Sequence, residues 1–129
     1  MITFTIPGKP VPKARARVMR AGWSYTPKKT VQAEALIRVI ALASLKANRN
    51  QILGPLNTGR VFVSMIFFGA RQNADLDNLF KLVTDACQGV FYKNDCQIDH
   101  AEIVRQSCAK GKEKTVVIMD AMHLEEIYD

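Results

Sequence analysis

Residues 61–88 read VFVSMIFFGARQNADLDNLFKLVTDACQ, and this stretch decides the fold. Its first part, residues 61–68, is rich in β-branched and aromatic side chains, and such a nearly continuous apolar run is typical of a strand buried in the middle of a sheet. Residues 69–74 form a polar connection. A helix is then expected over about residues 76–88, with Gly89 as its C-cap.

A long helix is expected before this strand. Thr26 is predicted as its N-cap and Pro27 as its first helical residue. The apolar residues that recur at helical spacing are Val31, Ala35, Val39, Leu42 and Ala43. The helix should end at residues 48–50, and residues 51–60 should form a loop. We expect its apolar surface to pack into the core, and its surplus of aliphatic side chains makes it a weak candidate for a dimer contact.

Short strands complete the predicted fold. Two are expected at residues 2–6 and 23–25, before the long helix. Two more, at residues 98–107 and 115–119, are predicted to form a β-hairpin around the turn at residues 110–112. The order β, β, α, β, α, β, β predicts an α/β (α+β) fold, with a mixed sheet and two main helices.

Composition and charge limit the class of protein. With 129 residues the chain is expected to form one domain, residues 1–129, large enough for a core of its own. The formal net charge is +6, which favours a nucleic acid or another anionic partner. Three cysteines without a CxxC pair and the absence of a signal-like start indicate a reduced, cytoplasmic chain. No apolar run approaches the roughly 18 residues of a membrane span, and the acidic end, residues 124–129, is expected to fray.

Residues 9–20 form a basic segment. The prolines at positions 10 and 12 disfavour a regular helix, so we expect an extended basic arm. The cations predicted to bind a nucleic-acid backbone are Lys9, Lys13, Arg15, Arg17 and Arg20, with Lys28 and Lys29 beside them. Such contacts are independent of base sequence and weaken as salt rises. The alternative is an ordinary solvated basic surface.

Acidic residues gather at the start of the second helix. Asp75 and Asp77 are separated by one residue, and in an extended segment such side chains point to the same side. Both could therefore face one metal ion. Magnesium prefers oxygen ligands and is usually held by one or two carboxylates, with phosphate and water completing its shell. The alternative for either residue is a simple helix cap.

Further polar residues follow along the chain. Lys81 lies four residues after Asp77, and Asp85 lies four residues after Lys81, which places all three on one helix face. Lys81 would contact the scissile phosphate or the attacking water, or else form a surface salt bridge. Asp85 is expected to be a structural partner of Lys81 or of the basic arm. Asp95 would join Asp75 only if the chain folds back; its alternative is a turn residue.

These residues together carry a family resemblance. The pattern Asp75-x-Asp77-Asn78-x-x-Lys81-x-x-x-Asp85, followed by Asp95-x-Gln97, resembles the signature of the RusA family of Holliday-junction resolvases. The opening FTIPGKPVPKAR, residues 4–15, also resembles the start of that family. The resemblance runs from about residue 2 to residue 119 and implies a RusA-like fold. It also implies a small homodimeric endonuclease that cuts four-way DNA junctions with Mg²⁺, which Mn²⁺ can replace.

The resemblance also implies roles for individual residues. Asp75, Asp77 and Asp95 match the catalytic acids of the family and are expected to be the metal ligands. Lys81 matches its functionally important lysine. One position departs from the pattern: the family often has two adjacent aspartates before x-Gln, and here Asn94 stands in the first of them.

We therefore predict a Mg²⁺-dependent, structure-specific DNA endonuclease that resolves four-way junctions by phosphodiester hydrolysis during recombination and repair. Prophage origin follows only from the resemblance. Two alternatives remain open. The chain could be a less selective metal-dependent nuclease on branched DNA, or a non-catalytic DNA-binding accessory module in which the acids are structural caps.

Overall fold

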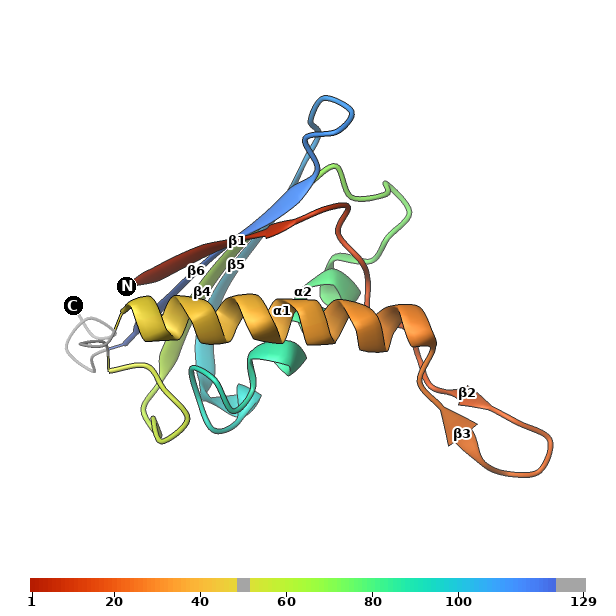
Figure 1. Ribbon diagram of the computed structural model, residues 1–129, viewed down its shortest axis with the longest axis horizontal. Helices are drawn as coiled ribbons and strands as arrows, with labels where there is room; N and C mark the ends of the chain where they lie inside the picture. Colours follow the sequence, from red (N-terminus) through yellow and green to blue (C-terminus); the bar gives the residue numbers. More distant parts are fainter. Residues whose placement is uncertain (49–51, 123–129) are drawn as a thin grey trace.

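Four strands form a mixed sheet in the order β1-β6-β4-β5 in the computed structural model, which describes residues 1–48 and 52–122 (Figure 1). The strands are β1 (Ile2–Pro7), β4 (Val61–Phe68), β5 (Ile98–Gln106) and β6 (Lys114–Ala121). The remaining elements are the helices α1 (Lys28–Ala47) and α2 (Leu76–Cys87), the 3₁₀ turn η1 (Asp95–Gln97) and a small separate hairpin of β2 (Arg17–Val18) and β3 (Ser24–Tyr25). The predicted α+β class with a mixed sheet and two main helices is confirmed.

The centre of the sheet is a β-α-β crossover. β4 pairs in parallel with β5, and α2 connects them. Because parallel neighbours need such a crossover, α2 runs back along the sheet: it starts beyond the carboxyl end of β4 and ends near the start of β5. The predicted hairpin of residues 98–107 and 115–119 is therefore wrong. β6 pairs with β1 and β4 instead, and β4 lies between β5 and β6.

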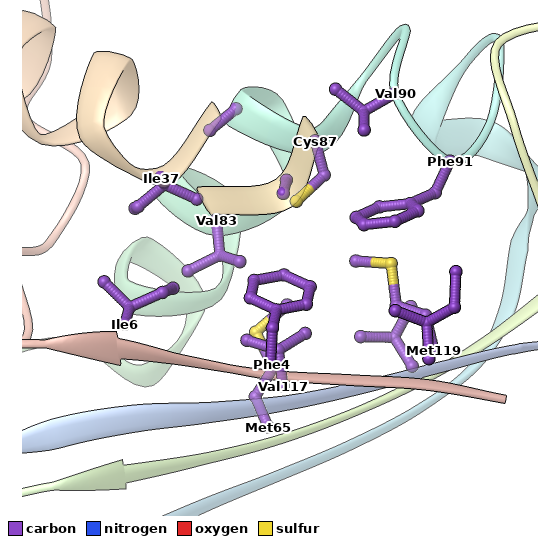
Figure 2. Packing of buried hydrophobic residues seen from close by; sticks show 14 of the residues in the cluster. Phe4, Ile6, Ile37, Met65, Val83, Cys87, Val90, Phe91, Val117 and Met119 are labelled. Carbon is purple, nitrogen blue, oxygen red and sulfur yellow. The ribbon is translucent and has the colours of Figure 1, made fainter. Parts of the chain in front are cut away.

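The core lies between the sheet and the two helices, which pack on the same side of it (Figure 2). Alternate residues of β4, such as Val63 and Met65, point into this core and are fully buried. Phe4 of β1 stacks on Phe91 with ring centroids 5.7 Å apart. Cys87 is also buried here, and this burial raises the pKa of its thiol to about 12, so it behaves as a core side chain.

The opposite face of the sheet is less covered. The side chains of β4 that point to it are half-buried: Phe62, Ser64, Ile66 and Phe68. Neither helix packs on this face within residues 1–48 and 52–122. The prediction of a central strand is thus confirmed for β4. Its apolar residues are not all buried, because alternate side chains point to the covered face and to the open face of the sheet.

α1 differs from its prediction at its start and in its buried face. Pro27, with ψ 141°, is the N-cap and makes no side-chain cap hydrogen bond, so the expected Thr26 cap is wrong. The helix buries Thr30, Ile37 and Ala41. All the apolar residues predicted from helical spacing are exposed: Val31, Ala35, Val39, Leu42 and Ala43. α1 is apolar on nearly every side, so the spacing of one set of residues did not identify the face that packs.

Two further predictions concern the rest of the chain. The loop before β4 is confirmed over residues 52–60, while the acidic tail at residues 124–129 lies outside the described residues. Within the part of the chain that the structure describes, neither helix combines the length and apolarity that a membrane crossing needs.

Candidate active site

The N-terminus of α2 brings two of the predicted acids together. Asp75 is the N-cap, and its Oδ1 accepts a hydrogen bond from the Asp77 backbone N–H at 3.1 Å. Asp77 lies in the first helical turn, so the pair spans a helix cap rather than the extended segment that was expected. Both residues are exposed. Negative charge here is favoured by the unpaired N–H groups and the dipole of the helix.

Arg105 of β5 holds the loop that leads to this pair. Its Nη1 donates to the backbone carbonyls of Arg71 and Gln72 at 2.8 and 2.6 Å. Its Nη2 donates to the carbonyl of Ala74, the residue before Asp75. A planar guanidinium can make such divergent contacts at once, and a lysine cannot. Sequence reasoning missed Arg105, because a cation in an edge strand has no distinctive pattern.

Lys81 stands one turn along α2 from Asp77. Its side chain is 57% exposed, and its Nζ lies 3.9 Å from Asp85 Oδ1, a long and weak contact. Asp85 is also 3.3 Å from Lys13 Nζ of the basic arm. Both partners predicted for Asp85 are therefore present. Lys81 remains available to an anion that approaches the helix N-terminus from solvent.

The basic arm is attached to the same helix turn. The Lys13 N–H donates to the Asn78 carbonyl at 2.8 Å. The Lys13 side chain pairs with Glu34 as well as Asp85. Burial alone would lower the pKa of Lys13, but hydrogen bonds and attraction from the two carboxylates outweigh it and raise that pKa. Lys13 thus anchors the arm to α1 and α2.

The other predicted cations of the arm are placed around this anchor. Lys9, Arg15 and Arg20 are exposed, and Arg17 begins β2. A cleft of about 320 Å³ lies between the arm and the loop before Asp75. Its basic lining residues are Lys9, Lys29 and Arg71, and its apolar walls include prolines of the arm. A cleft with this charge, adjacent to two carboxylates, is suited to a phosphodiester backbone.

Asp95 lies at the other end of α2. Its backbone N–H donates to the side chain of Gln88, the C-cap of that helix, at 3.3 Å. α2 has 12 residues, so its two ends are separated by about 18 Å at 1.5 Å per residue. One chain therefore pairs Asp75 with Asp77 and leaves Asp95 apart. Among the described residues, no group of three or more His, Cys, Asp and Glu side chains is placed to hold a metal ion.

Hydrogen bonds fix the turn that carries Asp95. Asn94 caps η1 by accepting from the Cys96 N–H at 3.0 Å. Gln97 is buried, and its Oε1 accepts from the Lys93 and Asn94 N–H groups, while its Nε2 donates to two loop carbonyls at 2.8 Å. An aspartate at position 94 could cap in the same way, since both residue types are good N-caps. The Asp-x-Gln spacing is thus explained by a rigid turn around Asp95.

Arg60 supports the same turn from outside. Its Nη2 donates to the Cys96 carbonyl at 2.6 Å, and its Nε donates to Asp99 Oδ2 at 2.7 Å. The guanidinium hydrogen bond lowers the pKa of the Asp99 carboxyl. Neither Arg60 nor Asp99 was predicted from the sequence, where they lie far apart. Asp95 is therefore half-buried on a turn that hydrogen bonds hold in place.

The paired acids, the exposed lysine and the basic cleft correspond to the features expected of a DNA-cutting site. No curated protein matches the chain. A family model described as "Endodeoxyribonuclease RusA" matches residues 7–119 of the 129-residue chain. This match contains the arm, both helices and η1. It also contains the four predicted catalytic residues, which are Asp75, Asp77, Lys81 and Asp95. Because it covers most of the chain, the protein belongs to the RusA family of endodeoxyribonucleases.

Proposed function

We propose that this chain resolves four-way DNA junctions as a Mg²⁺-dependent endonuclease acting in recombination and repair. One observation carries the proposal: a pair of exposed carboxylates, Asp75 and Asp77, lies in the helix turn to which the basic arm is hydrogen-bonded through Lys13. Cations of the arm would hold a DNA strand while the carboxylates face its phosphate. Membership of an endodeoxyribonuclease family supports hydrolysis of DNA.

The donor set at Asp75 and Asp77 fits a hard divalent cation. Mg²⁺ is usually held by one or two carboxylates together with substrate phosphate, whereas structural zinc needs several nitrogen or sulfur ligands. One oxygen of Asp75 accepts the cap hydrogen bond, and within residues 1–48 and 52–122 the second accepts no such bond. A bound Mg²⁺, or Mn²⁺ in its place, would supply an activated water and neutralise charge on the phosphate.

The protein's own residues then have separate tasks. Asp75 and Asp77 would orient the ion beside the strand. Lys81, exposed and one turn away, would stabilise negative charge that develops on the phosphate oxygens. Lys9, Arg15, Arg17 and Arg20 would hold the flanking backbone, and Lys13 would keep the arm in place.

A homodimer is part of the proposal. A four-way junction has near two-fold symmetry, and paired cuts need two sites related by a two-fold axis. Apolar dimer contacts could come from the open face of the sheet or from the exposed apolar side chains of α1. Dimerisation would also explain how Asp95 contributes to catalysis: the Asp95 of one chain would complete the Asp75–Asp77 pair of the other.

The decisive experiment is a cleavage assay on a synthetic four-way junction beside a linear duplex of the same sequence, with Mg²⁺ or with EDTA. We expect paired, symmetric nicks on the junction alone, and none with EDTA. Equal cutting of the duplex would indicate a less selective nuclease. Tight junction binding without cutting in Mg²⁺ or Mn²⁺ would leave a non-catalytic DNA-binding module and refute the proposal.

Replacing Arg105 tests the positioning of the acidic pair. Arg105→Lys removes the set of guanidinium hydrogen bonds to the carbonyls of Arg71, Gln72 and Ala74, so the loop before Asp75 is no longer fixed. We expect the cleavage rate to fall about tenfold or more, since a small misplacement of reacting groups is costly, while the junction dissociation constant changes little. Ser107→Ala, a change at an exposed residue just after the same strand, is the control. An unchanged rate in Arg105→Lys would show that these contacts do not position the site.

A further inference from the structure

The β2–β3 hairpin projects from the body of the protein (Figure 1). It carries exposed apolar side chains. Every residue from 18 to 26 is exposed. Trp23 is 55% exposed, Tyr25 41% and Val18 76%. Single exposed apolar residues are common on proteins, but a tryptophan and a tyrosine together on one protruding element suggest a contact surface.

The hairpin is a defined structure. Arg17 pairs with Tyr25, and the Met19 N–H donates to the Trp23 carbonyl at 2.8 Å. The turn is closed by a hydrogen bond from the Gly22 N–H to the Met19 carbonyl at 2.9 Å. Gly22 has φ +89°, a conformation that side-chain-bearing residues rarely adopt. The local sequence therefore specifies this turn.

The two aromatic rings form one surface on the hairpin. The Trp23 and Tyr25 ring centroids are 5.9 Å apart, with their planes tilted by 43°. Trp23 directly precedes β3 and Tyr25 ends it, and in an extended segment residues two apart point to one face. Neither ring belongs to the hydrophobic core, so their removal should not unfold the protein.

The charge around the hairpin selects the partner. The first acidic residue of the chain is Glu34, so only cations and neutral residues precede it. Exposed Arg20 lies on the hairpin and exposed Arg15 lies just before it, and Lys28 and Lys29 follow the hairpin. Aromatic rings interleaved with cations are the combination that binds nucleic acid through both base faces and phosphates.

The position of the hairpin relative to the candidate active site determines which bases it reaches. The arm is anchored by Lys13 at the first turn of α2, and Met19, which is bonded to Trp23, follows six residues later. At about 3.3 Å per extended residue this gives a reach of up to about 20 Å, or about six base-pair steps of 3.4 Å. In continuous duplex the base faces are stacked and inaccessible. At a branch point the stacking is interrupted, and base faces become available.

We propose that the β2–β3 hairpin stacks Trp23 and Tyr25 on bases exposed at the DNA branch point, so that this hairpin distinguishes branched DNA from continuous duplex. The inference rests on the proposed function, in that the strand to be cut lies at Asp75 and Asp77. It assigns the selection of DNA structure to residues distinct from those that would hydrolyse the phosphodiester.

Trp23 is the only tryptophan in the chain, so its fluorescence reports on the hairpin directly. The full-length protein is titrated, in EDTA to prevent cleavage, with a four-way junction and with a linear duplex of equal length. We expect the junction to quench Trp23 emission by half or more, and the duplex to quench it much less. A blue-shift with anionic lipid vesicles, without quenching by the junction, would overturn the proposal in favour of a membrane surface.

Variants test the energetic part of the proposal. Trp23→Ala should weaken junction binding about tenfold, corresponding to the loss of one base–aromatic stack, and leave duplex binding unchanged. Trp23→Phe should restore most of the preference. Arg20→Ala should weaken binding to both DNAs alike, and Gln32→Ala, a change at an exposed polar residue of α1, should alter neither. Equal junction affinity for wild type and Trp23→Ala would overturn the proposal.

The test of the hairpin can fail independently of the test of the proposed function, because the first measures DNA binding in EDTA and the second measures cleavage. Junction-specific quenching by a protein that never cuts DNA would retain the hairpin assignment and refute the resolvase. Junction cutting without any change in Trp23 emission would refute the hairpin alone.

Discussion

Asp77→Asn should lower the rate of junction cleavage at least about a thousandfold and leave the junction dissociation constant within about twofold. Asparagine preserves the size of the side chain and one oxygen, but removes the charge that would hold a divalent cation. A thousandfold loss corresponds to about 4 kcal/mol of transition-state stabilisation, a magnitude expected when a metal ligand is lost. Single-turnover cleavage and fluorescence-anisotropy binding measure the two quantities separately.

Thermal unfolding distinguishes this role from that of a helix cap. Asp77 lies in the first turn of α2, where its charge contributes roughly 0.3–1 kcal/mol through the helix dipole. If Asp77 only stabilised the helix, Asp77→Asn would lower the melting temperature slightly and leave cleavage intact. The control is Glu102→Gln, which removes an exposed carboxylate from β5 and should affect neither activity nor stability. Cleavage by Asp77→Asn at the wild-type rate would contradict its assignment as a ligand.

The neighbouring cap allows a second separation of these roles. Asp75 caps α2 through its side-chain oxygen, and asparagine and serine cap helices about as well as aspartate. Asp75→Asn and Asp75→Ser should therefore both keep the helix stable and both lose cleavage. The cap hydrogen bond from the Asp77 N–H has an acceptor in both variants. Asp75→Asn changes the charge with little change in size, and Asp75→Ser also removes the second oxygen.

The strand–loop–helix unit at residues 61–88 was predictable because its signals are local. The apolar strand, the polar connection and Gly89 each specify their own segment. Gly89 was predicted as the C-cap; the C-cap is Gln88, and Gly89, with φ +83°, is the next residue. The pairing of β5 and β6 was not predictable in the same way. Two strands joined by a short turn usually pair, but β4 lies between them, and a non-local parallel pairing leaves no mark in the sequence of β5.

The buried face of α1 could not be predicted from the sequence either. Ile37 and Ala41 are buried while Val39 is 65% exposed, although all three are apolar. Periodicity identifies a packing face only where polar residues occupy the other side. On α1 apolar residues occupy nearly all sides, so the tertiary partners decide, and these are known only from the fold.

The candidate active site was predictable in part, because some of its residues are close in sequence. Asp75, Asp77 and Lys81 are neighbours on one helix, and spacing alone places them together. Asp95 and Arg105 depend on how α2 and β5 are arranged in space. The length of α2 separates Asp95 from the pair, and the crossover brings Arg105 to the loop before Asp75.

Mixing two inactive variants, Asp77→Asn and Asp95→Asn, should restore cleavage. In a mixed dimer, the Asp95→Asn chain supplies intact Asp75 and Asp77, and the Asp77→Asn chain supplies an intact Asp95. If each site is completed by the partner chain, one of the two sites of the mixed dimer is wild type and the other carries both changes. The physical reason is the separation of about 18 Å between the ends of α2, which keeps Asp95 away from the pair of its own chain.

The expected amount of rescue follows from dimer statistics. Random exchange makes about half of the dimers mixed, each with one of two sites intact, so the total nicking rate should recover to about a quarter of wild type. The product should also change: a mixed dimer nicks one strand and leaves the opposed strand whole, whereas the wild type makes paired cuts. Two affinity tags, one on each variant, purify the mixed dimer and raise the expected recovery to about half.

The activities of Asp77→Asn and Asp95→Asn measured alone decide how the mixing experiment is interpreted. Asp95→Asn alone must be inactive for complementation to have meaning; an active Asp95→Asn would remove Asp95 from the site altogether. Two inactive variants whose purified mixed dimer is also inactive would show that Asp95 acts within its own chain. That result would require α2 and η1 to rearrange on DNA, because the folded chain keeps Asp95 at the far end of the helix from Asp75.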